Sequence, residues 1–225
     1  MMEVKYATDA HLQSIEEKRK LQREGMRLFW RRLRANKMAL YGGSIVLLLS
    51  LFVLIAPFFT NYTPLEIDPA NRLQPPSQDH WFGTDNFGRD IFTRVVYGGR
   101  VSLVVGFASA LLTGLIGMMV GLFAAYYRIF DHILMRICDG LLAFPDILLA
   151  IAITAVLGPN PINVIIAITI VKVPAMARIV RSAALVVREQ TYIEAIKAQG
   201  ANAFRIIWGH IAPNVLSPFF VQVTY

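Results

Sequence analysis

Residues 188–213 of this 225-residue chain read REQTYIEAIKAQGANAFRIIWGHIAP, a polar, helix-forming stretch between long apolar runs. Its pattern predicts a helix, a turn and a second helix. Residues 192–199 are mostly good helix formers, and Gly200 follows where the end of a helix needs a residue that tolerates positive φ. Asn202 is suited to cap the second helix, and Pro213 is expected to end it.

The predicted second helix carries an apolar stripe. Its members recur at the i, i+3, i+4, i+7 spacing of one helix face: Phe204, Ile207, Trp208 and Ile211. A short pair of helices with such a face needs something to cover it, and a groove on a soluble partner would do so. The alternative is an amphipathic loop that lies on the lipid surface.

The composition is that of a membrane protein. The chain is 56% hydrophobic and only 16% charged, with a mean hydropathy of +0.51. The net charge is +7, but the basic residues cluster at the edges of apolar runs, so we interpret them as topology signals and not as a nucleic-acid footprint. Cys138 is the only cysteine, which excludes an intrachain disulfide, and the four histidines lack the spacing of metal ligands. The sequence predicts no cofactor.

The apolar runs predict an all-α polytopic membrane protein. Residues 38–59 contain no charged side chain and would extend about 33 Å as a helix, enough to cross a bilayer. Further runs predict a second span at 101–127, a third at 141–157, a fourth at 162–180 and the start of a fifth from 214. Residues 128–139 are predicted to be a short turn.

Segments outside the spans are polar. Residues 1–37 are expected to be cytoplasmic, with a capping box at Ser14 and Glu17. Leu28, Phe29, Trp30 and Leu33 lie among arginines and indicate an interfacial helix, although a solvated basic tail is an equal alternative for the first dozen residues. Residues 60–99 form an external loop, in which Asp85 or Asn86 would cap a short helix closed by Gly98.

The distribution of Lys and Arg gives the orientation. Segments predicted to be inside hold ten basic residues in 1–37, two in 128–139 and five between 178 and 205, against four outside. The positive-inside rule therefore places the N-terminus and residues 188–213 in the cytoplasm.

Three features of the spans are candidates for packing or function. Gly117 and Gly121 form a GxxxG pair, which predicts a packing surface within the chain or between subunits. Asp146, beside Pro145, is either a carboxylate facing a pathway or an ordinary residue at a helix start. Lys172 is expected toward the inner boundary, where a long side chain can reach the interface.

Residues in the opening stretch resemble a known family. Glu194, Ala195, Gly200 and Pro213 match the EAA loop of binding-protein-dependent ABC importer permeases, although Ile196 and Ala212 depart from its usual residues. His210 is similar to the dipeptide, oligopeptide and nickel subgroup. The resemblance implies that this loop, with Arg205 among its residues, docks into a cytoplasmic ATPase and passes ATP-driven movement to the spans.

A second stretch carries the same resemblance. Residues 80–103 are similar to the segment before the second span in C-type permeases of this subgroup. The matching positions are Gly83, Thr84, Asp85, Gly88, Arg89 and Asp90. The sequence alone offers no physical reason for these particular residues.

The resemblance implies a type I ABC importer transmembrane domain with about five of six spans present, so we expect a truncated or naturally short chain. It implies one permease subunit, forming half of a pathway for peptides or a related small solute, in a bacterial or archaeal plasma membrane. The implied partners are a second, homologous permease, two ATPase subunits and an extracytoplasmic solute-binding protein. The chain lacks a GxxxxGK[ST] phosphate loop, so ATP hydrolysis is expected in the partners and not here. The cargo stays open.

Other functions compete with this one. An ion-coupled secondary transporter would need ionisable groups near the membrane midplane, and only Asp146 and Lys172 approach that description. A membrane-embedded enzyme would need a nucleophile and base or a metal cluster at one depth, which the sequence does not offer. A non-transporting scaffold subunit is the remaining alternative.

Overall fold

The computed structural model describes residues 31 and 34–224, and most of these are helical. The predicted capping box at Ser14 and Glu17 and the apolar residues 28–30 and Leu33 lie outside the described residues. Within them, the only β-type pairing is an isolated antiparallel bridge between Thr84 and Asp90. The chain divides after Tyr97 into two compact units, which we describe separately.

The first unit begins with an apolar helix. Helix α2 (Lys37–Ile55) continues as the 3-10 turn η1 (Ala56–Phe59), and the two together nearly coincide with the expected span 38–59. The side chain of Asn36 caps α2 by accepting from the Ala39 N–H at 3.1 Å. None of the α2 residues is buried within the chain, as expected of a helix that faces lipid all round.

Helix α3 (Ile91–Tyr126) is one uninterrupted helix of 36 residues, and the expectation of a separate short helix ending at Gly98 is wrong. Gly98 and the adjacent Gly99 each cost only about 1 kcal/mol inside a helix, which so long a helix tolerates. The predicted cap is also wrong. The Asp90 side chain, not that of Asp85 or Asn86, accepts from the Thr93 N–H at 2.7 Å.

In the second unit, residues 128–157 do not form a turn and a straight span. They form helix α4 (Arg128–Leu142) and helix α5 (Asp146–Leu157), which meet at an angle of 92°. Two aspartates of α4 form ion pairs with helix α6 (Pro161–Arg188). Asp139 accepts from Arg178 at 2.6 Å and Asp131 accepts from Arg181 at 2.7 Å.

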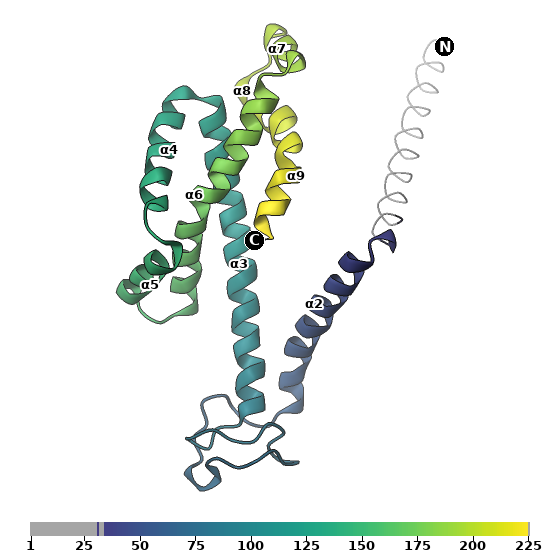
Figure 1. The fold of residues 1–225 in the computed structure, drawn as a ribbon, viewed down its shortest axis with the longest axis vertical. Coiled ribbons are helices and arrows are strands. Elements are labelled where there is room, and N and C mark those ends of the chain that lie inside the picture. The colour runs from purple at the N-terminus through teal and green to yellow at the C-terminus, as the bar shows by residue number, and fades with distance from the viewer. Residues whose placement is uncertain (1–30, 32–33, 225) are drawn as a thin grey trace, which may run out of the picture. The chain divides into compact units, whose positions relative to one another are not determined.

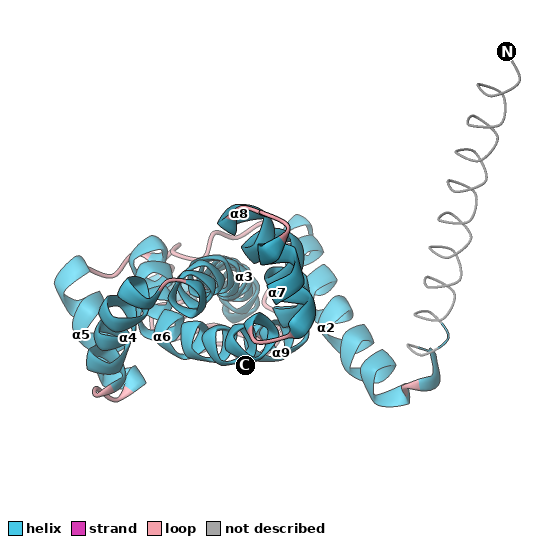
Figure 2. Cartoon of the chain, turned by 90° about the horizontal axis from the view of Figure 1, so that it is seen from above, coloured by secondary structure: helices cyan, strands magenta, loops and turns pink. Residues whose placement is uncertain are grey.

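Helix α6 is the central element of this unit. Helices α4 and α5 contact it on one side and helix α9 (Ala212–Val223) on the other, as Figures 1 and 2 both show. Helix α6 continues to Arg188, so the place of Lys172 relative to the inner membrane boundary stays a prediction. Lys172 lies about 17 Å from the start of the helix, near the middle.

The predicted glycine pair packs within the chain. A Cβ at Gly121 would lie 2.6 Å from the carbonyl oxygen of Ala177, and a Cβ at Gly117 would overlap with Met176. These two glycines therefore let α3 approach α6 closely, as small residues do in membrane helix pairs. Leu122, Ala125, Met176, Val180 and Ala184 continue the same contact as a buried core.

Pro213 does not end a helix, contrary to expectation. Helix α8 (Ala203–Ile206), the π-helical segment η3 (Ile207–Ile211) and α9 form one continuous helical run of 21 residues, so the second coupling helix and the expected fifth span are one element. In η3, Ala212 donates to the carbonyl of Ile207. Pro213 then occupies the first turn of α9, where the missing N–H costs least.

The described residues contain four helical segments long and apolar enough to span a membrane. These are Lys37–Phe59, Ile91–Tyr126, Pro161–Arg188 and Ala203–Val223, with the bent pair α4 and α5 as a fifth if it counts as one span. The all-α polytopic class predicted from the sequence is confirmed.

Candidate functional site

The coupling segment, residues 188–213, is built as a small helical unit at the C-terminal end of α6. Helix α7 (Thr191–Ala198) follows after two residues, and a turn then leads to α8. Figure 1 shows α7 beyond the end of α6, and Figure 2 shows α7 and α8 on the same end of the second unit. The predicted order of helix, turn and helix is confirmed.

The turn depends on Gly200. Its φ is +82°, a left-handed conformation that glycine adopts without steric cost. The Gly200 N–H donates to the carbonyl of Lys197 at 2.9 Å, and the Ala201 N–H donates to that of Ile196 at 3.3 Å. Asn202 then caps α8 as predicted, because its side chain accepts from the Arg205 N–H at 2.9 Å. Both ends of the turn are therefore fixed by local hydrogen bonds.

Buried isoleucines fasten this unit to the membrane helices. Ile193 of α7 and the residues Ile206, Ile207 and Ile211 are almost inaccessible, and they join the core formed by α3 and α6. Replacing one such isoleucine with alanine typically lowers the free energy of unfolding by about 2 to 5 kcal/mol. Buried apolar contacts therefore attach α7 and α8 to α3 and α6.

The exposed face of the coupling segment holds only part of the apolar stripe that the sequence predicted. Phe204 is 72% exposed and Trp208 36% exposed, with ring centroids 6.4 Å apart, whereas Ile207 and Ile211 are buried. The expected single face thus divides into a buried isoleucine row and an exposed aromatic pair, because η3 changes the helical register between α8 and α9. Glu194, Ala195, Gly200, Arg205 and Pro213 are exposed as well.

Polar contacts link the unit to the spans. Arg188 donates to the carbonyl of Ala125 at 2.6 Å, and the ammonium of Lys197 lies 5.9 Å from the ring centroid of Tyr126. Both contacts reach the C-terminal end of α3. Sequence reasoning missed them because they join residues more than sixty positions apart.

His210 and Pro213 lie where the unit enters α9. His210 is half-buried, and its carbonyl accepts from the Asn214 side chain at 2.7 Å. The same amide group lies 3.3 Å from the Tyr192 hydroxyl, which joins α7 to α9. The structure therefore brings the predicted residues together in the coupling segment. Glu194, Ala195 and Arg205 are exposed, whereas His210 and Pro213 lie where η3 joins α9.

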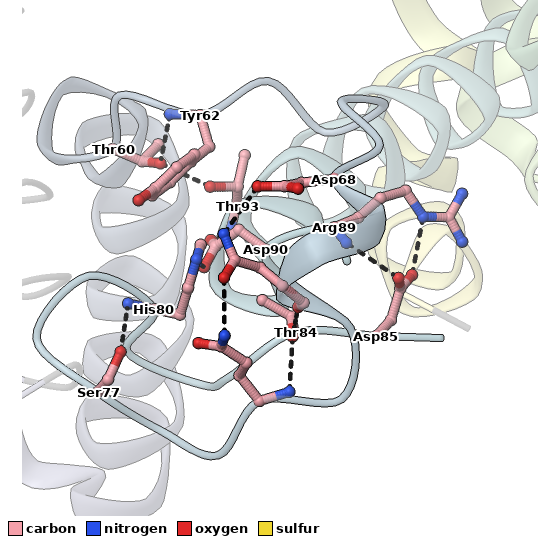
Figure 3. Close-up of polar contacts among 12 residues, drawn as sticks. Thr60, Tyr62, Asp68, Ser77, His80, Thr84, Asp85, Arg89, Asp90 and Thr93 are labelled. Atoms are coloured by element: carbon pink, nitrogen blue, oxygen red, sulfur yellow. Dashed lines mark hydrogen bonds and ion pairs between the residues drawn. The ribbon is translucent and has the colours of Figure 1, made fainter. Parts of the chain in front are cut away.

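The external signature residues form a separate network in the first unit, shown in Figure 3. Gly83 and Gly88 have φ values of +73° and +76°, and a Cβ at either position would overlap with the backbone at Gln74 or Asp68. The Thr84 hydroxyl accepts from the Gln74 N–H at 2.9 Å and donates to the carbonyl of Asn71. These residues hold the loop closed.

The charged signature residues complete this network. Asp85 accepts from the backbone N–H of Phe87 at 2.8 Å and of Arg89 at 3.1 Å, and it pairs with the Arg89 guanidinium at 2.8 Å. Desolvation alone would raise the pKa of Asp85, but these bonds to the carboxylate outweigh it and lower the pKa below its ordinary value. Closure of the external loop is therefore the physical reason for these particular residues, which the sequence alone did not give.

Asp90 joins the loop to α3. It caps the helix, and its carboxylate lies 3.1 Å from Nδ1 of buried His80 (Figure 3). The His80 ring is tilted against that of Tyr62, with ring centroids 4.8 Å apart. Burial, followed by the nearby charges of Asp79 and Asp90, raises the pKa of the Tyr62 hydroxyl. Among residues 31 and 34–224, no group of three metal-ligating side chains lies together.

Comparison with known proteins covers both units. Residues 117–225 match the family described as "Binding-protein-dependent transport system inner membrane component". Residues 26–76 match "N-terminal TM domain of oligopeptide transport permease C". The two matches are consecutive in the chain and agree in kind.

Individual relatives are transport permeases. The dipeptide transport system permease protein DppC of Alkalihalophilus pseudofirmus is 50% identical over 196 residues, which are 87% of this chain and 64% of that protein. The glutathione transport system permease protein GsiD of Pectobacterium atrosepticum is 43% identical over 197 residues, 87% of this chain and 65% of that protein. DppC of Bacillus subtilis is 42% identical over 197 residues, 87% of this chain and 61% of that protein.

The chain therefore belongs to the family of binding-protein-dependent transport permeases, and it is a multi-pass membrane protein. Within that family it is similar to C-type permeases, as the second match and the DppC relatives indicate. The chain spans 64% of the length of the first of these relatives.

Proposed function

We propose that this chain is the membrane subunit of an ATP-driven importer for peptides or a related small solute, and that it forms half of the translocation pathway. Two cytoplasmic ATPase subunits, a second permease and an extracytoplasmic binding protein would complete the transporter. The N-terminus and the coupling segment would lie in the cytoplasm of a bacterial or archaeal cell, with the first span at 38–59, the external loop at 60–99 and the permease core at 100–225.

The observation that carries this proposal is the construction of the coupling segment. Its buried isoleucines and the Arg188 contact fasten it to α3 and α6, while Phe204 and Trp208 stay exposed. An exposed aromatic pair at the end of a rigid helix is suited to insert into a groove on a partner protein. A push on this surface would move α3 and α6 together.

The predicted coupling residues take different roles in this proposal. Glu194, Ala195 and Arg205 are on the exposed surface and would contact the ATPase. Gly200 sets the angle between α7 and α8, while His210 and Pro213 lie at the junction with α9 and would carry movement into that span. Coupling would then be a rigid-body change between two arrangements of the helices.

Reconstitution tests the proposed function. The complete transporter in proteoliposomes should accumulate labelled dipeptide only when ATP, the ATPase subunits and the binding protein are all present, and a protonophore should leave uptake unchanged. Uptake that persists without the ATPase subunits and collapses with the protonophore would instead identify an ion-coupled transporter. Complexes that hydrolyse ATP without any response to loaded binding protein would favour the scaffold alternative.

A further inference from the structure

A cavity of about 350 Å³ lies between α3, α6 and the end of α9 in the second unit. Ser109 and Thr113 line it from α3, Lys172 and Met176 from α6, and Gln222 from α9. Its volume is within the range of about 300 to 1,000 Å³ that small-molecule sites occupy. Ser109 and Lys172 lie near the middles of their helices, so the cavity is at mid-depth in the apolar part of the protein.

Two residues of the cavity wall carry buried hydroxyl groups that have no partner among the described residues. Ser109 is 5% exposed and Thr113 is 8% exposed, and neither hydroxyl makes a hydrogen bond within the described chain. Hydroxyls in membrane helices usually donate to the carbonyl four residues earlier, as Thr154 and Thr169 do here at 2.7 Å. Leaving a buried hydroxyl unpaired costs about 1 to 3 kcal/mol, so two such groups one turn apart indicate a site for a polar ligand.

Lys172 brings a positive charge to the wall of the cavity, with about half of its side chain exposed. Its ammonium is held by the Asp146 carboxylate at 3.0 Å, and its side chain lines the cavity. A lysine ammonium has three N–H donors, of which Asp146 accepts one. With 50% of its side chain exposed, the ammonium can use its remaining donors to bind an anionic group.

We infer that this cavity is a contact site for the free carboxylate of a solute on its way through the permease. Lys172 would supply the charge, and the hydroxyls of Ser109 and Thr113 would donate hydrogen bonds to the carboxylate or the neighbouring peptide group. Met176 offers an apolar and adaptable wall for varied side chains. This inference rests on the proposed function and gives it a substrate class, namely small peptides with an unblocked C-terminus.

Cysteine labelling tests whether the site is open to water and to solute. Cys138 is the only cysteine of this chain, so Ser109→Cys in a Cys138→Ala background gives a single reporter in this subunit of the assembled transporter. A charged methanethiosulfonate should modify this cysteine in at least one nucleotide state, and trialanine presented by the binding protein should slow the reaction at least fivefold. Trialanine amide should protect much less.

Each other result would overturn the inference. Modification by an apolar maleimide but not by the charged reagent would mean that lipid fills the cavity. No modification by either reagent in any state would mean that another polypeptide segment or a partner subunit fills it. Equal protection by trialanine and its amide would mean that the carboxylate is not recognised.

Uptake measurements test the residues themselves. In Ser109→Ala/Thr113→Val, and separately in Lys172→Gln/Asp146→Asn, the preference for trialanine over its amide should fall about tenfold. The second pair removes both charges together and leaves no unpaired ion. Thr169→Val is the matched control, because it removes a buried hydroxyl that has a partner, and it should not change the preference. A loss of uptake that is equal for both peptides would assign these residues a structural role only.

Different results would refute the transport function and the carboxylate site. Wild-type transporter that shows no ATP-dependent uptake of any peptide would refute the proposed function. Wild-type transporter that takes up trialanine and its amide with equal efficiency would refute the carboxylate site and leave the proposed function intact.

Discussion

Replacing Gly200 with valine should separate ATP hydrolysis from transport. The residue has a φ of +82°, and a Cβ there would meet no atom within 4 Å, so the cost comes from the backbone conformation alone. For a residue with a Cβ the left-handed conformation costs about 1 to 2 kcal/mol. That cost corresponds to a roughly 5- to 30-fold smaller population of the native turn.

Gly200→Asn is the matched control. Asparagine also adds a Cβ but adopts the left-handed conformation far more readily, so it should retain most of the uptake. Both variants should insert into the membrane at wild-type levels, because the buried isoleucines that fasten the coupling segment are unchanged. The assay compares ATP hydrolysis with uptake of labelled dipeptide in proteoliposomes.

The expected result is a fall in peptide transported per ATP hydrolysed, by at least fivefold in the valine variant and by less than twofold in the asparagine variant. Equal transport by the valine variant and the wild type would refute the reasoning. A similar loss in both variants would show that the cost is contact with the partner and not backbone geometry.

Three other perturbations test the packing and the external loop. Gly121→Ala should destabilise the α3–α6 contact by about 1 to 3 kcal/mol, because the new Cβ would lie 2.6 Å from a backbone oxygen, whereas Gly140→Ala, with open space around it, should not; thermal unfolding in detergent would measure both. Gly88→Ala should make residues 60–90 sensitive to limited proteolysis, since positive φ and the Asp68 backbone both oppose it, while Gly98→Ala should have no effect. Because the pKa of Asp85 is lowered in the folded loop, its ionised form stabilises the fold at any pH above the ordinary pKa of a carboxyl group, and this contribution is lost as the pH falls through the pKa of the folded state. The wild type should therefore have a higher melting temperature than Asp85→Asn at pH 7. The difference in melting temperature should shrink toward pH 3.

Features with a local cause could be predicted from the sequence. The first span, the positive φ of Gly200 and the Asn202 cap each depend on residues within one or two turns. The close contact at Gly117 and Gly121 was predictable as a packing surface, because only small residues permit such an approach. Its partner within the chain, α6, was not.

Features with a long-range cause were missed. Residues 128–139 were expected to be a short turn, but they belong to helix α4, in which Asp131 and Asp139 pair with arginines of α6. The break at Pro145 is visible in the sequence, yet the 92° angle depends on what both helices contact. The π-helical segment before Pro213 and the unpaired hydroxyls of Ser109 and Thr113 likewise have no local signature.

The residues of the external signature were found by resemblance, without a physical reason for them. The residues from Gly83 to Asp90 were noticed only through resemblance, and their reason is a closed loop in which two glycines meet backbone. Thr84 and Asp85 each bind backbone groups several residues away. A resemblance identified the residues that matter, and the structure supplied the cause.

Site-specific cross-linking tests the central claim most directly. In a Cys138→Ala background, Ala195→Cys reports on the coupling segment. Val156→Cys is the control, because Val156 is 87% exposed. Val156 lies at the end of α5, close in sequence to the start of α6, whereas the coupling segment follows the end of α6, a helix about 42 Å long. We predict that a short bifunctional maleimide joins the Ala195→Cys variant to the ATPase subunit, that ATP changes the yield, and that the Val156→Cys variant gives no such product. A coupling segment that never cross-links to the ATPase, or that an impermeant reagent labels from outside intact cells, would contradict the account.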